Sequence, residues 1–277
     1  MHIACNEYKM LIRIPYFRIF LLIILTIMVV DPLSVRIHAI MDPALLEYAG
    51  YNPFQFWLLI NSVNWGNLVY NTLFWIFPSV IATASLYIER DTVYYLAKIK
   101  SYGRKRYYIT KTITVFLFSF AYFLAALVIN IAITYVVFWG HWEQTDYFAK
   151  MVPLDGTFSY VFYTHGQLVF AVFYAVLNSL TIALFSMLCV TINFIYRFKN
   201  MYLATIVPSL LLYAITFIFD SSQELVQYNI RTIIQPRAVS ALDSIISSEN
   251  VIITLSVWSI LILGYTVYGI YKYKDLI

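Results

Sequence analysis

Charge is scarce in this chain. Only 12% of its 277 residues are Asp, Glu, Lys or Arg, against about 25% in a typical soluble domain. Apolar residues make up 62%, and the mean hydropathy is +0.76. A water-soluble fold of this length needs far more surface charge, so the composition indicates that a lipid bilayer surrounds most side chains. The small net charge of +4 gives no reason to expect a nucleic-acid partner.

The motifs of common enzyme classes are absent as well. None of the eight glycines belongs to a Gly-x-x-x-x-Gly-Lys-Ser/Thr arrangement, so the chain has no P-loop for ATP. Neither His-Glu-x-x-His nor Gly-x-Ser-x-Gly occurs, and the two cysteines, Cys5 and Cys189, fit no metal or redox spacing. We therefore expect no catalytic, cofactor-binding or metal-binding residue. Cys189 is interpreted as a small buried hydrophobe.

Ionisable residues deep within the apolar runs are also missing. Arg18 and Asp31 flank the first run, and we expect both to reach a membrane interface. An ion-coupled carrier usually needs a buried carboxylate or a broken-helix ion site, so this pattern counts against one. Four asparagines within the runs are interpreted as hydrogen-bonding groups between helices, with ion coordination left open. They are Asn71, Asn130, Asn178 and Asn193.

Long uncharged runs dominate what is present. They predict an all-α polytopic membrane protein, a single transmembrane domain over 1–277. Six transmembrane helices are expected at about 16–36, 67–87, 112–139, 167–194, 201–219 and 250–271. Pro78 is expected to kink the second span. An interfacial or re-entrant segment is predicted at about 53–62, and amphipathic outer-surface helices within 220–249, broken at Pro236.

The basic residues assign the two sides of the membrane. With six spans, fourteen of the eighteen Lys and Arg residues fall on one side and ten of the fourteen acidic residues on the other. Lys and Arg near span ends mark the cytoplasmic side. Both termini are therefore expected in the cytoplasm, and the chain is expected in the plasma membrane. Without the first span, the basic N-terminal residues would lie outside.

The loop 89–111 holds seven of the eighteen basic residues in 23 positions. Asp91 suits an N-cap and Gly103 a helix end, so we predict a short amphipathic helix between them. Tyr95, Ile99 and Tyr102 share one face of that helix, and Leu96 joins them beside Ile99. The bases alone need only be a topological anchor at anionic headgroups. A capped helix with a Tyr-rich face favours docking of a partner.

This loop resembles the one that follows the second span in export-type permeases of ABC transporters, the ABC type-2 membrane subunits. The six-span layout and the helical segment before the last span are similar too. In that family the short helix couples the bundle to a separate ATPase. Carried over residue by residue, the acidic-Arg-acidic entry, the helix and the basic exit are Glu89, Arg90, Asp91, Tyr94, Tyr95, Leu96, Ile99, Arg104 and Lys111.

The resemblance implies a transport subunit that is not itself an enzyme. Its expected partners are ABC ATPase subunits, which hold ATP and Mg, a second permease copy or homologous permease, and the lipid bilayer. Apolar, aromatic spans favour a hydrophobic or amphipathic cargo such as a peptide, a lipid-like molecule or a drug. Two alternatives stay open. One is a non-transporting membrane sensor, immunity or scaffold protein, and the other is an ion-coupled secondary carrier.

Overall fold

The computed structural model of this chain describes residues 14–42, 52–61, 64–90, 93–139, 157–196, 198–222, 224–236 and 246–272, with Pro153 and Asp155. Every regular element in these ranges is helical. The α-helices are α2 (Pro15–Met41), α4 (Trp65–Leu73), α5 (Ile76–Arg90), α6 (Val93–Tyr102), α7 (Arg104–Val137), α9 (Tyr160–Thr164), α10 (Gln167–Ile195), α11 (Met201–Asp220), α12 (Ile230–Ile234) and α13 (Ser248–Lys272). Two 3-10 helices are η1 (Pro53–Phe56) and η2 (Val226–Tyr228).

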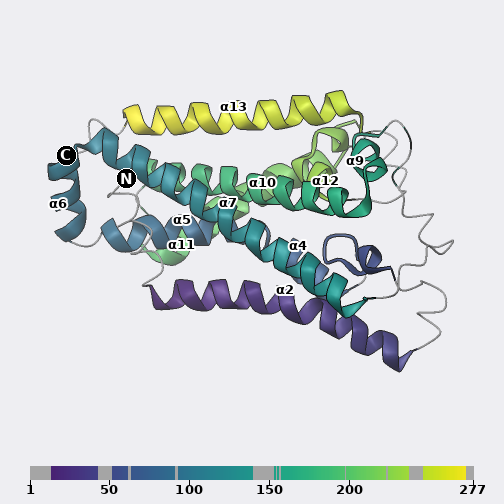
Figure 1. Cartoon of the computed structure of the whole chain (residues 1–277). Helices are drawn as coiled ribbons and strands as arrows, with labels where there is room; N and C mark the ends of the chain where they lie inside the picture. The colour runs from purple at the N-terminus through teal and green to yellow at the C-terminus, as the bar shows by residue number, and fades with distance from the viewer. Residues whose placement is uncertain are drawn as a thin grey trace.

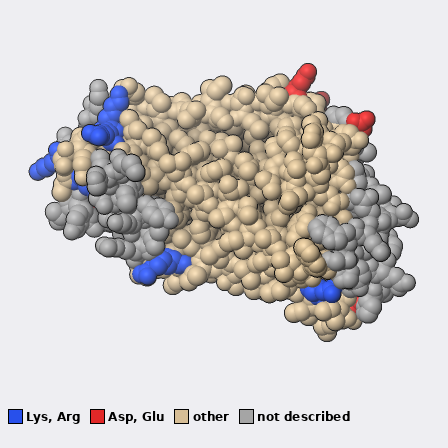
Figure 2. All heavy atoms as spheres, viewed as in Figure 1, with Lys and Arg blue, Asp and Glu red and all other residues tan. Residues whose placement is uncertain are grey.

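Within the described part of the chain, five helices are long and apolar enough to cross a membrane: α2, α7, α10, α11 and α13. The pair α4 and α5 also qualifies if it forms one bent span. Figure 1 shows α6 at one end of this bundle and α9 and α12 at the other. In Figure 2, Lys and Arg gather mainly toward the α6 end, and a broad uncharged surface separates the two ends. The protein is an all-α, multi-pass membrane protein.

The helix α4–α5 is broken where the sequence predicts a kink. Phe74 and Trp75 separate the two helices, which meet at an angle of 51°. Pro78 has no N–H to bond the carbonyl of Phe74 four residues earlier, so the helix opens one turn before the proline. The first and third spans also differ from expectation. α2 extends to Met41, and α7 already begins at Arg104.

The helix α10 is the centre of the bundle. It contacts α5, α7 and α13. In an apolar stretch of 18 residues, 61% of the α10 residues are buried inside the protein, compared with 22% in the corresponding stretch of α13. Short hydroxyl pairs link it to its neighbours. Ser119 Oγ donates to Ser186 Oγ over 3.0 Å, and Thr191 Oγ1 donates to Thr266 Oγ1 over 3.1 Å. Such bonds and close packing hold helices together in lipid, where apolar burial gives little net drive. Cys189 on α10 is buried, as predicted.

Residues 52–60 form a short segment that lies inside the bundle rather than on its surface. Each of these nine side chains is buried. The backbone of Leu58 is held from both sides, because its N–H donates to Asn130 Oδ1 over 3.4 Å and its carbonyl accepts from Asn67 Nδ2 over 2.7 Å. Asn130 Nδ2 also donates to the Met28 carbonyl over 2.7 Å. The segment is thereby tied to α2, α4 and α7.

The other intramembrane asparagines also bind between elements, as the sequence predicts. Asn178 Nδ2 donates to the carbonyl of Ile234 over 2.7 Å, and Asn193 Nδ2 donates to that of Ala204 over 3.2 Å. Asn71 Oδ1 accepts from Gln235 Nε2 over 3.0 Å. The α9 end of the bundle is therefore linked to α12 by neutral amide hydrogen bonds.

The segment before the last span contains η2 and α12. Its buried apolar side chains are Val226, Ile230, Ile233 and Ile234. A helical element is therefore present before Pro236, but four of the five residues of α12, Thr232 among them, are buried, so α12 packs into the protein and is not an amphipathic helix on the outer surface. The part of the predicted amphipathic stretch over 237–245 lies outside the described residues.

Asp31 in α2 is fully buried, and this corrects the expectation that it reaches a membrane interface. Its exposed fraction is 0%. Asn64 Nδ2 donates to Oδ1, and the backbone N–H of Gly66 also donates to the carboxylate. Oδ2 is buried and has no hydrogen-bond partner among the described residues. The expectation failed because α4 packs against α2 and covers this position. Arg18 is exposed, as expected.

The contact between Asp31 and α4 requires a glycine at position 66. A Cβ on Gly66 would lie 2.8 Å from Asp31 Cβ and closer still to the carboxylate, whereas one on Gly264 meets nothing within 4 Å. We expect Gly66→Ala to lower the free energy of unfolding in detergent by about 1–3 kcal/mol. Gly264→Ala, the control, should be neutral or slightly stabilising. Combining Gly66→Ala with Asp31→Ala should restore only part of the loss, because the carboxylate clash is removed but the two Cβ atoms remain 2.8 Å apart. Equal stability of the two single variants would contradict the close approach.

Candidate functional site

The loop between α5 and α7 consists of one helix and one tight turn. α6 is the predicted short helix, and it ends at Gly103 as expected. Gly103 has φ of +76°, which glycine adopts without strain, and its N–H donates to the Ile99 carbonyl over 3.0 Å. The turn leads directly into α7, which begins at Arg104. Figure 1 shows α6 lying across the end of the bundle.

Glu89, near the end of α5, is the centre of a buried ion cluster. Its exposed fraction is 4%, and that of Lys111 is 2%. Lys111 Nζ donates to Oε2 over 2.5 Å, Tyr107 OH donates to the same oxygen over 3.0 Å, and Lys98 Nζ donates to Oε1. We call Glu89, Lys98, Tyr107 and Lys111 the Glu89 cluster. It joins α5 to α6 and to α7.

The electrostatics of the cluster favour an ionised Glu89. Burial by itself raises the pKa of this carboxyl, because it takes the charge out of water. The charges and hydrogen bonds of Lys111 and Lys98 outweigh burial and hold the pKa of Glu89 below its ordinary value of 4.5. A buried pair of this kind is stable only while all partners remain in place.

Tyrosine rings make the second connection between α6 and the bundle. Tyr95 OH and Tyr108 OH are 2.7 Å apart and share a hydrogen bond. The ring of Tyr107 lies edge-on to both, at centroid distances of 5.7 Å to Tyr95 and 5.4 Å to Tyr108. Tyr108 in turn packs on Phe194 of α10 at 4.2 Å. The helix α6 is thus coupled through α7 to the central helix.

The predicted loop residues fall into three groups. The buried contacts contain Glu89, Tyr95 and Lys111. Partly or largely exposed residues are Leu96, Ile99 and Arg104. Asp91 lies outside the described residues, and so do the side chains of Arg90 and Tyr94. The prediction that Tyr95 and Leu96 share one face of α6 is wrong, because Tyr95 is buried against the bundle while Leu96 is 56% exposed.

Three members of the site were missed from the sequence: Lys98, Tyr107 and Tyr108. All three lie within loop 89–111 but outside the residues that match the family pattern. The signal that could have found them is a glutamate beside an apolar run, because such a carboxylate needs donors from neighbouring helices. The loop supplies those donors at the start of α7, which begins earlier than predicted.

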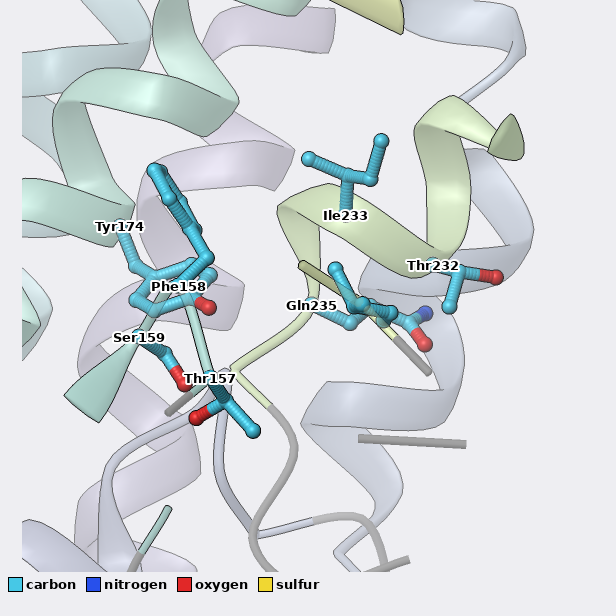
Figure 3. Close-up of a pocket in the computed structure, with 8 residues that line it drawn as sticks. Thr157, Phe158, Ser159, Tyr174, Thr232, Ile233 and Gln235 are labelled. Atoms are coloured by element: carbon cyan, nitrogen blue, oxygen red, sulfur yellow. The ribbon is translucent and has the colours of Figure 1, made fainter. Parts of the chain in front are cut away.

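The α9 end contains a cavity that is far smaller than a substrate site (Figure 3). Its volume is about 10 Å³, which is room for about one water molecule. Thr157, Ser159, Thr232 and Gln235 supply polar groups around it. Thr232 Oγ1 is buried and has no hydrogen-bond partner among the described residues. A single water is the occupant that this size and polarity fit.

Among the residues that the structure describes, no group of three or more His, Cys, Asp or Glu side chains could hold a metal ion. The chain matches no protein-family model, no curated protein and no solved structure. Functional interpretation therefore starts from the Glu89 cluster, α6 and the membrane bundle themselves.

Removing the Glu89 charge should destabilise the α6 end. Glu89→Gln leaves the ammonium of Lys111 buried without its counter-ion, and we expect a loss of about 3–5 kcal/mol in detergent unfolding. Glu249→Gln, at an exposed position in α13, is the control and should change little. The double variant Glu89→Gln with Lys111→Met should recover part of the loss. A Glu89→Gln protein as stable as the control would contradict the cluster.

The difference in unfolding stability between the wild-type protein and Glu89→Gln should also depend on pH. A pKa held below 4.5 in the folded chain means that Glu89 contributes its full stability above about pH 5 and loses it as the pH falls below 4.5. The difference in stability between wild type and Glu89→Gln should accordingly be constant from pH 6 to 8 and shrink in acid, by about 1.4 kcal/mol per unit of pKa shift. A difference that grows in acid would reverse the assignment.

Proposed function

We propose that this chain is the membrane-spanning permease subunit of an ATP-driven ABC exporter, and that α6 contacts a separate ATPase subunit. The observation that most supports this is the attachment of α6 to α5 and α7 at once through the Glu89 cluster. The similarity of loop 89–111 to the coupling loop of export-type permeases agrees with it. The sequence carries no P-loop, so ATP and Mg belong to the partner.

In this mechanism α6 transmits the motion of the ATPase subunit to the membrane bundle. A partner that displaces α6 pulls α5 through Lys98 and Glu89, and α7 through Tyr95 and Tyr108. Both helices contact α10, so the displacement reaches the centre of the bundle. Two such chains, or this chain and a homologue, pair with two ATPase subunits. The proposal takes the bent pair α4–α5 as the sixth span, with both termini and the basic α6 end in the cytoplasm and the complex in the plasma membrane.

Leu96 is the residue best placed for docking. It is 56% exposed near the centre of α6. Tyr95, in contrast, is buried and holds α6 against α7 through its hydrogen bond with Tyr108. A partly exposed apolar side chain on a fixed helix suits a groove on another protein. The role of Tyr95 is therefore positioning, and the direct contact falls to the opposite side of α6.

We expect the chain to co-purify with a P-loop ATPase encoded beside it. Leu96→Glu should reduce the recovered ATPase about tenfold, which corresponds to about 1.4 kcal/mol. Val161→Glu is the matched control, because Val161 has the same 56% exposure but lies on α9 at the opposite end. Both variants should insert and fold alike. Undiminished ATPase recovery with Leu96→Glu would overturn the docking role, and a chain that binds the ATPase without any ATP-dependent transport would be a sensor or scaffold.

The cargo that the surface favours is hydrophobic or amphipathic, because most of the membrane-facing surface is apolar. One observation favours ion coupling, rather than ATP, as the energy source for transport. Asp31 is a fully buried carboxylate inside a membrane helix, with one oxygen lacking a partner among the described residues. Such groups mark proton or ion pathways. An ion-coupled secondary carrier is therefore the second candidate function.

A single substitution separates the two candidates. The probe is a fluorescent amphiphile loaded into proteoliposomes that hold the chain with or without its ATPase. ATP-driven export predicts movement of the probe that needs ATP and persists in Asp31→Asn at half or more of the wild-type rate. A carrier predicts movement without ATP that collapses with the proton gradient and is lost in Asp31→Asn. The second pattern would replace the exporter assignment.

A further inference from the structure

A long apolar groove lies between α10, α11 and α13. α11 packs mainly on α5, and α13 packs on α10, so α10 forms the floor between the two outer helices. The groove encloses about 700 Å³, which is within the roughly 300–1,000 Å³ of small-molecule sites. All three walls belong to helices that are long and apolar enough to span a membrane. The groove therefore opens toward lipid.

The lining of the groove is apolar along its length. Leu211 and Ile215 of α11 face Trp258 and Ile262 of α13 across it. Its wall on α11 extends from Val207 to Phe219, or about 18 Å of helix. One leaflet of a bilayer contains about 15 Å of hydrocarbon. The groove thus matches one extended acyl chain in both chemistry and length.

Polar groups gather at one end of the groove. Tyr196 and Tyr265 line it there. Lys272 is close enough to interact electrostatically with Tyr265, and its Nζ lies 5.4 Å from the centroid of the Tyr268 ring. Tyr265, Tyr268 and Lys272 follow the spacing i, i+3 and i+7, so they share one face of α13. An apolar slot that ends in tyrosine side chains, with an ammonium two helical turns beyond them on α13, complements an anionic amphiphile.

We propose that this groove binds an anionic phospholipid of the surrounding bilayer. One acyl chain lies along α11 and α13, and the phosphate lies at Lys272, Tyr196 and Tyr265. Basic side chains at the membrane surface attract anionic headgroups, and tyrosines are favoured at the same depth. This lipid site does not depend on the exporter assignment, because its binding needs neither the ATPase nor a transport cycle.

Photo-crosslinking in nanodiscs tests the lipid site. The full chain is reconstituted with a trace of diazirine-labelled phosphatidylglycerol or phosphatidylcholine, and adducts are mapped by mass spectrometry. We expect labelling of groove residues by phosphatidylglycerol to exceed that by phosphatidylcholine several-fold. Leu211→Trp, which fills the groove, should lower this labelling about tenfold. Leu210→Trp is the control, because Leu210 is 59% exposed beside it and does not line the groove.

A variant and its matched control test the contact with the lipid headgroup. Lys272→Gln should abolish the preference for phosphatidylglycerol, whereas Lys105→Gln, at the same end but against Tyr271, should preserve it. Labelling that is equal for both lipids and unchanged by Leu211→Trp would show an ordinary lipid-facing surface and overturn the site. Groove residues that crosslink to a second copy of the chain instead would show a dimer contact and overturn it as well.

Discussion

One buried carboxylate organises the α6 end of the molecule. Glu89 is surrounded by Lys98, Tyr107 and Lys111, which come from α6 and α7. An uncompensated charge in this position costs several kcal/mol, so α5, α6 and α7 must come together for the charge to be tolerated. Apolar packing in lipid leaves helix neighbours weakly specified. Here the ionic cluster supplies the specificity, and α6 becomes a rigid part of the bundle.

The two ends of the bundle are held by different chemistry. At the α6 end, α6 itself is held by ionic and phenolic contacts, and one amide hydrogen bond from Asn193 links α10 to α11. At the α9 end they are amide hydrogen bonds, in which Asn130, Asn178 and Asn71 connect α7, α10 and α4 to the backbone of the buried segment 52–60 or to α12. Neutral amides exchange partners at lower energetic cost than buried ions do. The contacts at the α9 end therefore cost less to break than the Glu89 cluster does.

Local chemistry made part of this architecture predictable from sequence. Uncharged runs located the membrane helices, Pro78 located the bend and Gly103 located the end of α6, because each effect acts within one or two turns. The burial of Tyr95 was not predictable in that way, since it depends on Tyr108 across a turn. The sequence position of Asp31 suggests a membrane interface, and its burial depends on the close approach of Gly66, which only the fold reveals. The docking role of the loop stays a prediction.

The buried segment 52–60 constrains the order in which the parts of the bundle assemble. The backbone N–H of Leu58 donates to Asn130, 72 residues further along, and Asn52 Nδ2 donates to Gln167 Oε1, 115 residues further along. A nascent chain emerges N-terminus first, so the segment is synthesised long before these partners. Irregular backbone is not tolerated in contact with lipid. The contacts of this segment with Asn130 and Gln167 can form only after α7 and α10 have been synthesised, so the segment joins the bundle late in assembly.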